Sequence, residues 1–405
     1  MRNPVTRARS LRSDGSGEER GAVAVTVALL MVVLVGVGAF TVDFGMSYVS
    51  TRQLQTASDS AALAAAAKFG QLNGTCSTIS ADTAARAQIQ ADVAAYRTDN
   101  RAGSTGSITA VACAADGYGI EVTYRSAGST ARALGGIFGQ GNDYDTAKSA
   151  TAEVFVPPDG IGVRPYALCG SILPSVTTFP SPVFRMDLPS TGNSLCPGAS
   201  SSGNWWSVDC PEAPSNSNTY LGTATLNGCT SPINIVPNQA PRTGSALRNY
   251  LLNSCPVKSS SCLGANTGNL GGTPILNAWT SLVQDRRRIL LPVFCGTPSP
   301  CDQAAVVNAG GNNAIYPVQA LVGVIVCGYH FGTNNNQNSA AIPMDGDCGG
   351  VYNPSNLTAA TGSNQDNYLL LRAVRLQVSG GSGPPQCAIG DTSCDWGARG
   401  VKLTR

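Results

Sequence analysis

The sequence of 405 residues is poor in charge and has almost no histidine. Charged residues make up 12% of the chain, there is one His, and only four of the 26 basic residues are Lys. A nucleic-acid-binding surface needs clustered Lys and Arg, so a net charge of +2 excludes nucleic acid as an expected partner. One histidine also excludes a cluster of imidazole metal ligands. The apolar fraction of 42% still suffices for a folded core.

The longest uncharged run indicates a membrane anchor. Ala22 to Val42 contains 21 residues without a charge. As a helix this run is about 32 Å long, enough to cross a hydrocarbon core of about 30 Å. A cleaved signal peptide is the alternative, but its apolar region usually has only about 7–15 residues and ends in a small-x-small site. The run therefore predicts a retained signal anchor over residues 21–43.

The charges beside this run predict its orientation. Residues 1–20 carry five Arg against three acidic residues, whereas Arg52 is the only basic residue within fifteen positions after the run. By the positive-inside rule, residues 1–20 form a cytoplasmic tail. The prediction is a single-pass protein of the cell membrane, with the residues after 43 extracytoplasmic or at the cell surface.

The fourteen cysteines agree with export, because none lies before or within the apolar run. An even number of Cys in an exported chain predicts disulfides. A zinc or iron–sulfur site is the alternative, but the sequence has no C-x-x-C. Connectivity does not follow from sequence, so nearest-neighbour pairing is a hypothesis. It gives Cys76–Cys113, Cys169–Cys196, Cys210–Cys229, Cys255–Cys262, Cys295–Cys301, Cys327–Cys348 and Cys387–Cys394.

The segment after the anchor is rich in alanine. Tyr48 to Phe69 lacks Gly and Pro, and its composition predicts a continuing helix. Ala57, Ala61 and Ala64 stand at helical spacing and form a smooth stripe. The stripe suits close approach of a partner helix and equally suits an Ala-rich core helix, so both interpretations stay open.

A small α+β unit follows over residues 44–156. We expect a second helix from Ser80, as its N-cap, to Asp99. Alternating residues in 107–113 and 118–125 flank an Asp-Gly turn and predict a hairpin, with a third strand over 147–156. Pro157-Pro158-Asp159-Gly160 then breaks the pattern.

The remaining chain predicts a β-rich, Cys-rich exported domain over 161–379 and a loop-like C-terminal tail over 380–405. Short apolar runs at 289–294, 316–327 and 368–378 are separated by Gly, Asn, Ser and Pro. Residues 242–253 and 278–285 are expected as short helices. The predicted fold class is α+β: a transmembrane helix continuing into an Ala-rich helix, a small α+β unit, and a disulfide-stapled β-rich domain.

Catalytic motifs are missing from the sequence, which has no G-x-S-x-G, P-loop or H-E-x-x-H. His330 could act as a general base, but no residue pattern fixes its partners. Arg286-Arg287-Arg288 is either a patch for an anionic polymer or lipid or a solvated helix end. Trp205-Trp206 with Tyr220 is either a binding platform or a core cluster. We expect no enzyme activity, cofactor, metal or small-molecule substrate.

The residues around the apolar run carry a family resemblance. Glu19-Arg20-Gly21-Ala22 opens the run, and Val42-Asp43-Phe44-Gly45 closes it. Arg52-Gln53-Leu54-Gln55 and Ala57 to Ala64 follow in order. This order resembles the N-terminal region of the Flp pilus-assembly TadE/TadG-like family, most clearly over residues 19–70. Weaker support extends to 156 through Leu134 to Gly139 and Ala147 to Ala152, and the later exported region resembles the actinobacterial TadG-like type only loosely.

Two departures from this family refine the resemblance. Prepilin-type processing follows a Gly with Glu five residues on, but Thr26 stands there after Gly21, and Ala22 after Gly17. Some larger relatives carry a D-x-S-x-S metal motif, which Asp187-Leu188-Pro189-Ser190 does not reproduce. The resemblance thus implies an unprocessed, TadG-like anchor.

The resemblance implies a non-enzymatic component of a Tad/Flp-type pilus or its assembly machinery. Its anchor and Ala-rich helix would contact other single-span pilus or pseudopilin proteins, and its ectodomain would serve protein contacts or adhesion. The alternative is a signal-anchored secreted hydrolase or cell-wall-binding protein.

Overall fold

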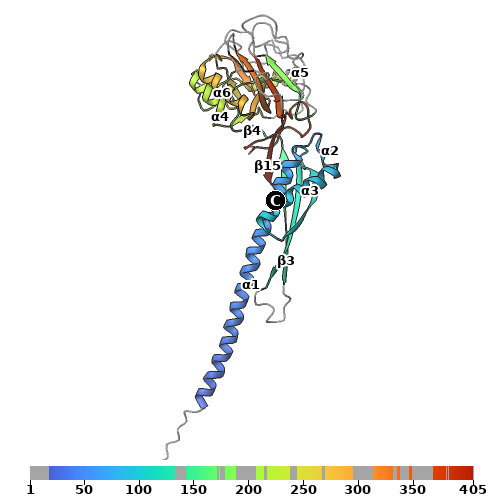
Figure 1. The fold of residues 1–405 in the computed structure, drawn as a ribbon, viewed down its shortest axis with the longest axis vertical. Coiled ribbons are helices and arrows are strands. Elements are labelled where there is room, and N and C mark those ends of the chain that lie inside the picture. The colour runs from blue at the N-terminus through green and yellow to red at the C-terminus, as the bar shows by residue number, and fades with distance from the viewer. Residues whose placement is uncertain are drawn as a thin grey trace, which may run out of the picture.

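The structure is a computed structural model of the full chain. It describes residues 18–132, 143–170, 173, 178–187, 207–213, 217–237, 244–266, 270–294, 313–331, 335–337, 346–348, 368–379, 381 and 383–404. A long helix projects from one end of a small α+β unit, and a larger β-rich unit lies at the opposite end of it (Figure 1). The predicted α+β fold class is confirmed.

Helix α1 (Glu18–Phe69) joins the expected anchor and the expected Ala-rich helix into one element of 52 residues. At 1.5 Å per residue it is about 78 Å long. The helix ends at Phe69, and a side chain on the next residue, Gly70, would collide with Val154: a Cβ built on Gly70 comes within 2.7 Å of Val154 Cγ2. Close contact with the sheet therefore requires glycine at this position.

The smaller unit, which we name the membrane-proximal unit after the anchor that the sequence predicts, packs α1 and a second helix onto one face of a sheet. It contains α2 (Cys76–Ala81), α3 (Thr83–Asn100), β1 (Thr105–Cys113), β2 (Ile120–Ala131) and β3 (Asp143–Phe155). The expected second helix is divided in two, and the cap of its main part is Asp82 rather than Ser80, because Asp82 Oδ1 accepts a hydrogen bond from the Ala85 amide at 2.9 Å. Buried Ile120, Val122 and Tyr124 face the alanines of α1 in one core cluster.

The C-terminal tail does not fit our expectation of a loop. β15 (Ala398–Leu403) is a strand of the membrane-proximal sheet, whose order is β1-β2-β3-β15-β14. It pairs antiparallel with β3, with Gly400 opposite Phe155 and Leu403 opposite Ala152, and it runs parallel to β14 (Leu376–Gln377). The prediction was wrong for residues 398–403, because their partner strand lies about 250 residues earlier and no local pattern reveals such a pairing; residues 383–397 contain no strand, as expected.

The larger unit contains a sheet of order β5-β9-β11-β13-β6, with β12 attached to β11. Helices α4 and α6 lie side by side against it (Figure 1). Its elements are β4 (Asp159–Gly160), β5 (Leu168–Cys169), β6 (Val183–Asp187), α4 (Asn218–Asn227), β7 (Ile233–Asn234), α5 (Gly244–Ser254), β8 (Cys262–Gly264), α6 (Thr273–Gln284), β9 (Arg288–Phe294), β10 (Ile315–Pro317), β11 (Ala320–Phe331), β12 (Asn335–Gln337), the short helix η7 (Gly346–Cys348) and β13 (Tyr368–Ala373).

The expected apolar runs supply β9, β10, β11, β13 and β14, and the two expected helices correspond to α5 and α6. Helix α4 was not expected. The core of this unit is centred on Trp279 of α6, whose ring packs edge-on against Tyr166 at a centroid distance of 4.9 Å.

The larger unit is inserted between two neighbouring strands of the smaller one. The chain leaves the membrane-proximal sheet after β3 and returns to the adjacent strand β15. The outgoing and returning segments touch, since the Ile161 amide lies 3.4 Å from the Ser379 carbonyl oxygen. The boundaries 44–156 and 161–379 remain our proposed domain limits, with β15 added to the first.

Five disulfides join described cysteines: Cys76–Cys113, Cys210–Cys229, Cys255–Cys262, Cys327–Cys348 and Cys387–Cys394. Each is a pair that nearest-neighbour pairing gives. The proposed pairs Cys169–Cys196 and Cys295–Cys301 involve cysteines outside the described residues. The disulfides occur in both units, and Cys76–Cys113 ties α2 to β1.

Candidate functional site: the anchor helix and the junction above it

The N-terminal half of α1 presents apolar side chains in all directions. From Val23 to Val49 its large hydrophobic residues are exposed, with Leu34 at 68%. The most apolar window has a mean hydropathy of 2.7, and 6% of it is buried. Exposed apolar surface of this extent is untenable in water, and this is the one described helix long and apolar enough to cross a membrane.

The C-terminal half of α1 is covered by the protein itself. Leu54, Ala57 and Ala61 have no exposed surface, and Ala64 is half-buried. Of the two open interpretations of the alanine stripe, the core helix is the one observed. The expectation that the Ala-rich helix contacts partner proteins is therefore wrong for this stripe, because small side chains here let the sheet approach α1 closely.

A polar clamp marks the point where the covered half of α1 begins. The Arg101 guanidinium donates to Gln53 Oε1 at 2.6 Å and to Thr130 Oγ1 at 3.0 Å. The Thr130 hydroxyl donates to Ser50 Oγ at 2.5 Å. These contacts join the end of α3 and the far end of β2 to α1, so the β2–β3 hairpin is held along the helix close to the apolar run (Figure 1).

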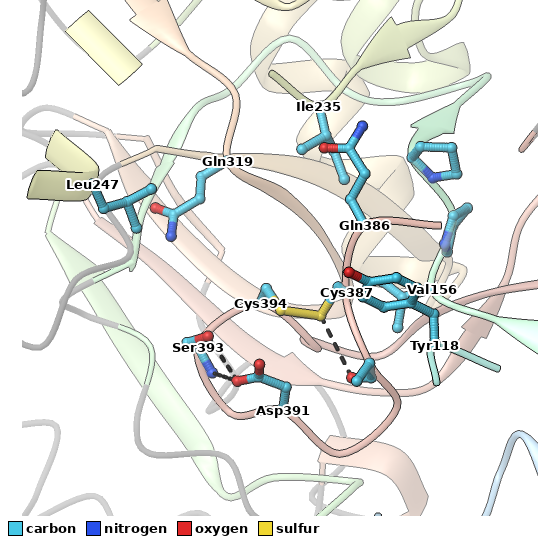
Figure 2. Close-up of a pocket in the computed structure, with 13 residues that line it drawn as sticks. Tyr118, Val156, Ile235, Leu247, Gln319, Gln386, Cys387, Asp391, Ser393 and Cys394 are labelled. Carbon is cyan, nitrogen blue, oxygen red and sulfur yellow. Dashed lines mark hydrogen bonds between the residues drawn. A yellow bond between two sulfur atoms is a disulfide. The ribbon is translucent and has the colours of Figure 1, made fainter. Parts of the chain in front are cut away.

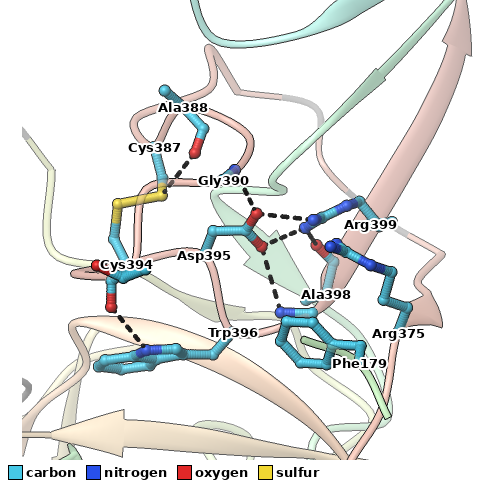
Figure 3. A network of polar contacts seen from close by, with 12 residues as sticks. Phe179, Arg375, Cys387, Ala388, Gly390, Cys394, Asp395, Trp396, Ala398 and Arg399 are labelled. Carbon is cyan, nitrogen blue, oxygen red and sulfur yellow. Dashed lines mark hydrogen bonds and ion pairs between the residues drawn. A yellow bond between two sulfur atoms is a disulfide. The ribbon is translucent and has the colours of Figure 1, made fainter. Parts of the chain in front are cut away.

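A buried charged network lies where the two units meet (Figure 3). Asp395 and Arg399 form an ion pair whose side chains are 2% and 1% exposed. The Asp395 carboxylate also accepts hydrogen bonds from the amides of Gly390, at 2.7 Å, and Gly397, at 3.3 Å. The network therefore fixes the Cys387–Cys394 loop to the start of β15.

Arg375 extends this network to the exit of α1. Its guanidinium lies 4.6 Å from the ring centroid of Phe179 and donates to Asn73 Oδ1 at 3.2 Å. Burial lowers the pKa of Arg375, and the negative charge of Asp395 acts in the opposite direction. Asn73 also exchanges two hydrogen bonds with the backbone of Phe179. The turn after α1 is thus bonded directly to the larger unit.

A cavity of about 230 Å³ lies beside the junction (Figure 2). Its lining is mainly apolar, with two amides and a serine–aspartate pair: Tyr118, Val156, Pro157, Pro158, Ile235, Leu247, Gln319, Gln386, Cys387, Ala388, Asp391, Ser393 and Cys394. Ser393 donates its hydroxyl proton to Asp391 at 2.7 Å, and the two cysteines are disulfide-bonded to each other. These lining residues include no histidine and no thiol.

The catalytic and binding candidates named from the sequence lie on different elements. His330 lies at the end of β11 and stacks on Tyr368 of β13 with a centroid distance of 5.3 Å. In the arginine run, Arg287 pairs with Asp285 at 3.2 Å, and Arg288 lies 3.8 Å from Asp347. Tyr220 packs against the core from α4, and Trp205-Trp206 lies outside the described residues. The arginine run is thus partly paired with acidic side chains.

One group of possible metal ligands has its ligand atoms engaged in other bonds. Cys210, Glu212 and Cys229 offer ligand atoms within 4.8 Å of one another. The two sulfur atoms are joined in a disulfide, and Glu212 accepts hydrogen bonds from Thr230 and Ser231. A disulfide sulfur is not a thiolate, so these residues do not suit a metal ion.

The Asp395–Arg399 pair and Arg375 were not predicted from the sequence. A signal was present, because an acid and an Arg four residues apart are conspicuous in a chain with so few charges. The burial of Asp395 and Arg399 depends on the entry of β15 into the sheet, which the loop prediction for residues 380–405 excluded.

The comparison with protein families gives one match. Residues 21–68 match the family described as putative Flp pilus-assembly TadE/G-like. This confirms the expected family resemblance over the segment that carries the motifs. No curated protein and no solved structure matches the chain. The matched segment coincides with α1, so the similarity covers the exposed apolar half and the covered alanine half.

Proposed function

We propose that this protein is a membrane-anchored, non-enzymatic component of a Tad/Flp-type pilus or its assembly machinery. The observation that carries the proposal is the coincidence of two properties in α1. The segment that matches the pilus-assembly family is the same helix whose first half exposes apolar side chains on all sides. Such a helix requires either lipid or other apolar helices around it.

The orientation rests on charge and on cysteine chemistry. Five Arg precede the apolar run, which favours a cytoplasmic N-terminus and export of the residues after 43. The disulfides suit an oxidising, extracytoplasmic compartment. Protease added to intact, wall-stripped cells should digest the residues after 43, and protection of that region would refute this orientation.

The partner surface we propose is the exposed half of α1, because the alanine stripe is already covered. Single-span pilus or pseudopilin proteins fit it, since their apolar helices match its composition. A photoreactive phenylalanine analogue at Leu34 should cross-link to single-span membrane proteins of the same machinery. The same analogue at Tyr96, which is half exposed on α3, is the matched control and should not. Equal cross-linking from both positions would contradict the assignment.

Deletion of the gene tests the function itself. We expect loss of surface fibres or adhesion, restored by the wild-type chain and by the His330→Ala variant. The alternative, a secreted hydrolase or wall-binding protein, predicts that His330→Ala abolishes a measurable activity while fibres persist. Normal fibres in the deletion strain would reject the pilus proposal.

A further inference from the structure

Three aromatic residues and one arginine form a continuous line on α1 where it leaves the apolar run. Phe40, Phe44, Tyr48 and Arg52 are four residues apart, so their side chains are neighbours along the helix. The rings of Phe40 and Phe44 stack, with centroids 6.0 Å apart and an interplanar angle of 18°. The guanidinium carbon of Arg52 lies 4.9 Å from the ring centroid of Tyr48. We name these four residues the aromatic–arginine ladder.

The ladder is open to its surroundings. The exposed fractions of Phe40, Phe44 and Tyr48 are 70%, 64% and 51%, and Arg52 is exposed as well. The hairpin and α3 cover a different part of α1, through Ser50 and Gln53. The described part of the chain therefore leaves the ladder available to an external ligand.

Helix geometry places the ladder across one membrane surface. Tyr48 lies six residues beyond Val42, the last residue of the apolar run, which is about 9 Å along the helix, and Arg52 lies about 15 Å beyond it. Helical side chains lean toward the N-terminus, so the Arg52 guanidinium drops to the level of Tyr48. The headgroup layer is about 5–7 Å thick on each side of the hydrocarbon core. Phe40 and Phe44 thus lie at the edge of the core. The guanidinium, at about 9 Å, lies about 2–4 Å beyond the headgroup layer, a distance over which it can still contact a phosphate.

The charge of the ladder selects its ligand. Arg52 is the only basic residue between Asp43 and Lys68, and no described carboxylate forms an ion pair with it. A guanidinium presents paired N–H donors that match a phosphate. Aromatic side chains at the headgroup level are typical of membrane-interface anchors.

We propose that the aromatic–arginine ladder binds the headgroup phosphate of an anionic phospholipid through Arg52, with its rings lying in the membrane interface. Binding would fix both the depth and the rotation of α1. A partner helix would need to supply a carboxylate opposite Arg52, whereas the bilayer provides a phosphate at that depth. This proposal rests on the membrane anchoring in the proposed function, but not on the role in a pilus.

Lipid retention by the full chain tests the proposal. The protein is incubated in detergent micelles with equal amounts of phosphatidylglycerol and phosphatidylcholine, and the retained lipids are counted by native mass spectrometry. We expect preferential retention of phosphatidylglycerol, a fall of at least threefold in that preference for Arg52→Gln, and a smaller fall for Arg52→Lys, which keeps the charge without the fork. Arg125→Gln removes an exposed charge from β2 and should leave the ratio unchanged.

Three outcomes would overturn the proposal. One is an unchanged lipid ratio in Arg52→Gln, and another is an equal fall in Arg125→Gln. The third is an oligomer that Phe44→Ala and Arg52→Gln dissociate while the lipid ratio stays constant, which would make the ladder a protein interface. Carbonate extraction of cell membranes separates this proposal from the proposed function. If the wild-type chain is extracted, anchoring itself fails; if it is retained and the ratio does not respond, only the lipid proposal fails.

Discussion

Removing one partner of the buried Asp395–Arg399 ion pair should release the C-terminal strand from the membrane-proximal sheet. In Asp395→Asn the guanidinium stays buried without a negative charge, and the side chain accepts fewer of the bonds now made by Arg399 and by the amides of Gly390 and Gly397. Breaking a buried ion pair from one side costs about 3–5 kcal/mol. A domain is stable by only about 5–15 kcal/mol, so this loss is a large fraction of the total.

Hydrogen exchange of β15 measures this loss where it occurs. Since each 1.4 kcal/mol is tenfold in an equilibrium constant, the amides of Gly400 to Leu403 should exchange faster by about two to three and a half powers of ten. Asp116→Asn, in the exposed turn between β1 and β2, is the control and should leave β15 protected. The amides of β11 in the larger unit provide a second reference within the same sample.

A double variant shows whether the charge is the cause. Replacing both partners, as Asp395→Leu with Arg399→Met, removes the unpaired charge of Arg399. Arg375 then loses the nearby charge of Asp395 but keeps its contacts with Asn73 and Phe179, so the double variant should recover part of the lost protection. A change in β15 exchange of less than about fivefold in Asp395→Asn, about 1 kcal/mol, would refute this role of the ion pair. It is equally refuted if the double variant loses as much as the two single variants together.

Three further changes test other parts of the fold. Ala61→Leu inserts a larger side chain between α1 and the sheet, where no space remains, and should lower the free energy of unfolding by about 1–3 kcal/mol, measured by denaturant titration. Truncation after residue 397 removes β15 and should make β3 a protease-sensitive edge, detected by limited proteolysis; an unchanged digest would contradict the pairing. Glu212 loses solvation on burial, which raises its pKa, but the hydrogen bonds from Thr230 and Ser231 bring the net pKa below its ordinary value of 4.5. Its contribution to stability is therefore present above that value and is lost as the pH falls through the lowered pKa, so acid unfolding should be less steep in Glu212→Gln than in the wild type.

Local signals predicted much of the membrane-proximal unit. The uncharged run and the alanine-rich segment indicated one helical region, and the Asp116-Gly117 turn located the β1–β2 hairpin, where the Asp116 carboxylate accepts from the Tyr118 amide at 2.9 Å. Each of these features is decided by neighbours in sequence. The alanine stripe left two interpretations open, because small residues suit a partner helix and the protein's own sheet equally well.

Helix α4 shows why tertiary contacts defeat a sequence pattern. Its sequence contains Gly222 and several Thr, which lower helix propensity. A Cβ at Gly222 would come within 2.7–2.8 Å of Pro274 at the start of α6. The contact between α4 and α6 therefore requires glycine at this position. Gly222 lowers the helix propensity of α4, but it also allows α4 to pack against α6.

The connection between the two units follows from the non-local pairing of β3 with β15. Because the larger unit is inserted between β3 and β15, two chain segments cross the junction instead of one. Asn73, in the turn after α1, also bonds to the backbone of Phe179 in the larger unit, at 2.9 Å and 3.2 Å. A unit that is joined by two chain segments and by the bonds between Asn73 and Phe179 resists the hinge motion that a single linker would allow. In the membrane topology that we propose, the orientation of α1 therefore also sets the orientation of the larger unit, so a lipid or a helix that binds α1 would determine which surfaces of that unit are presented to a partner.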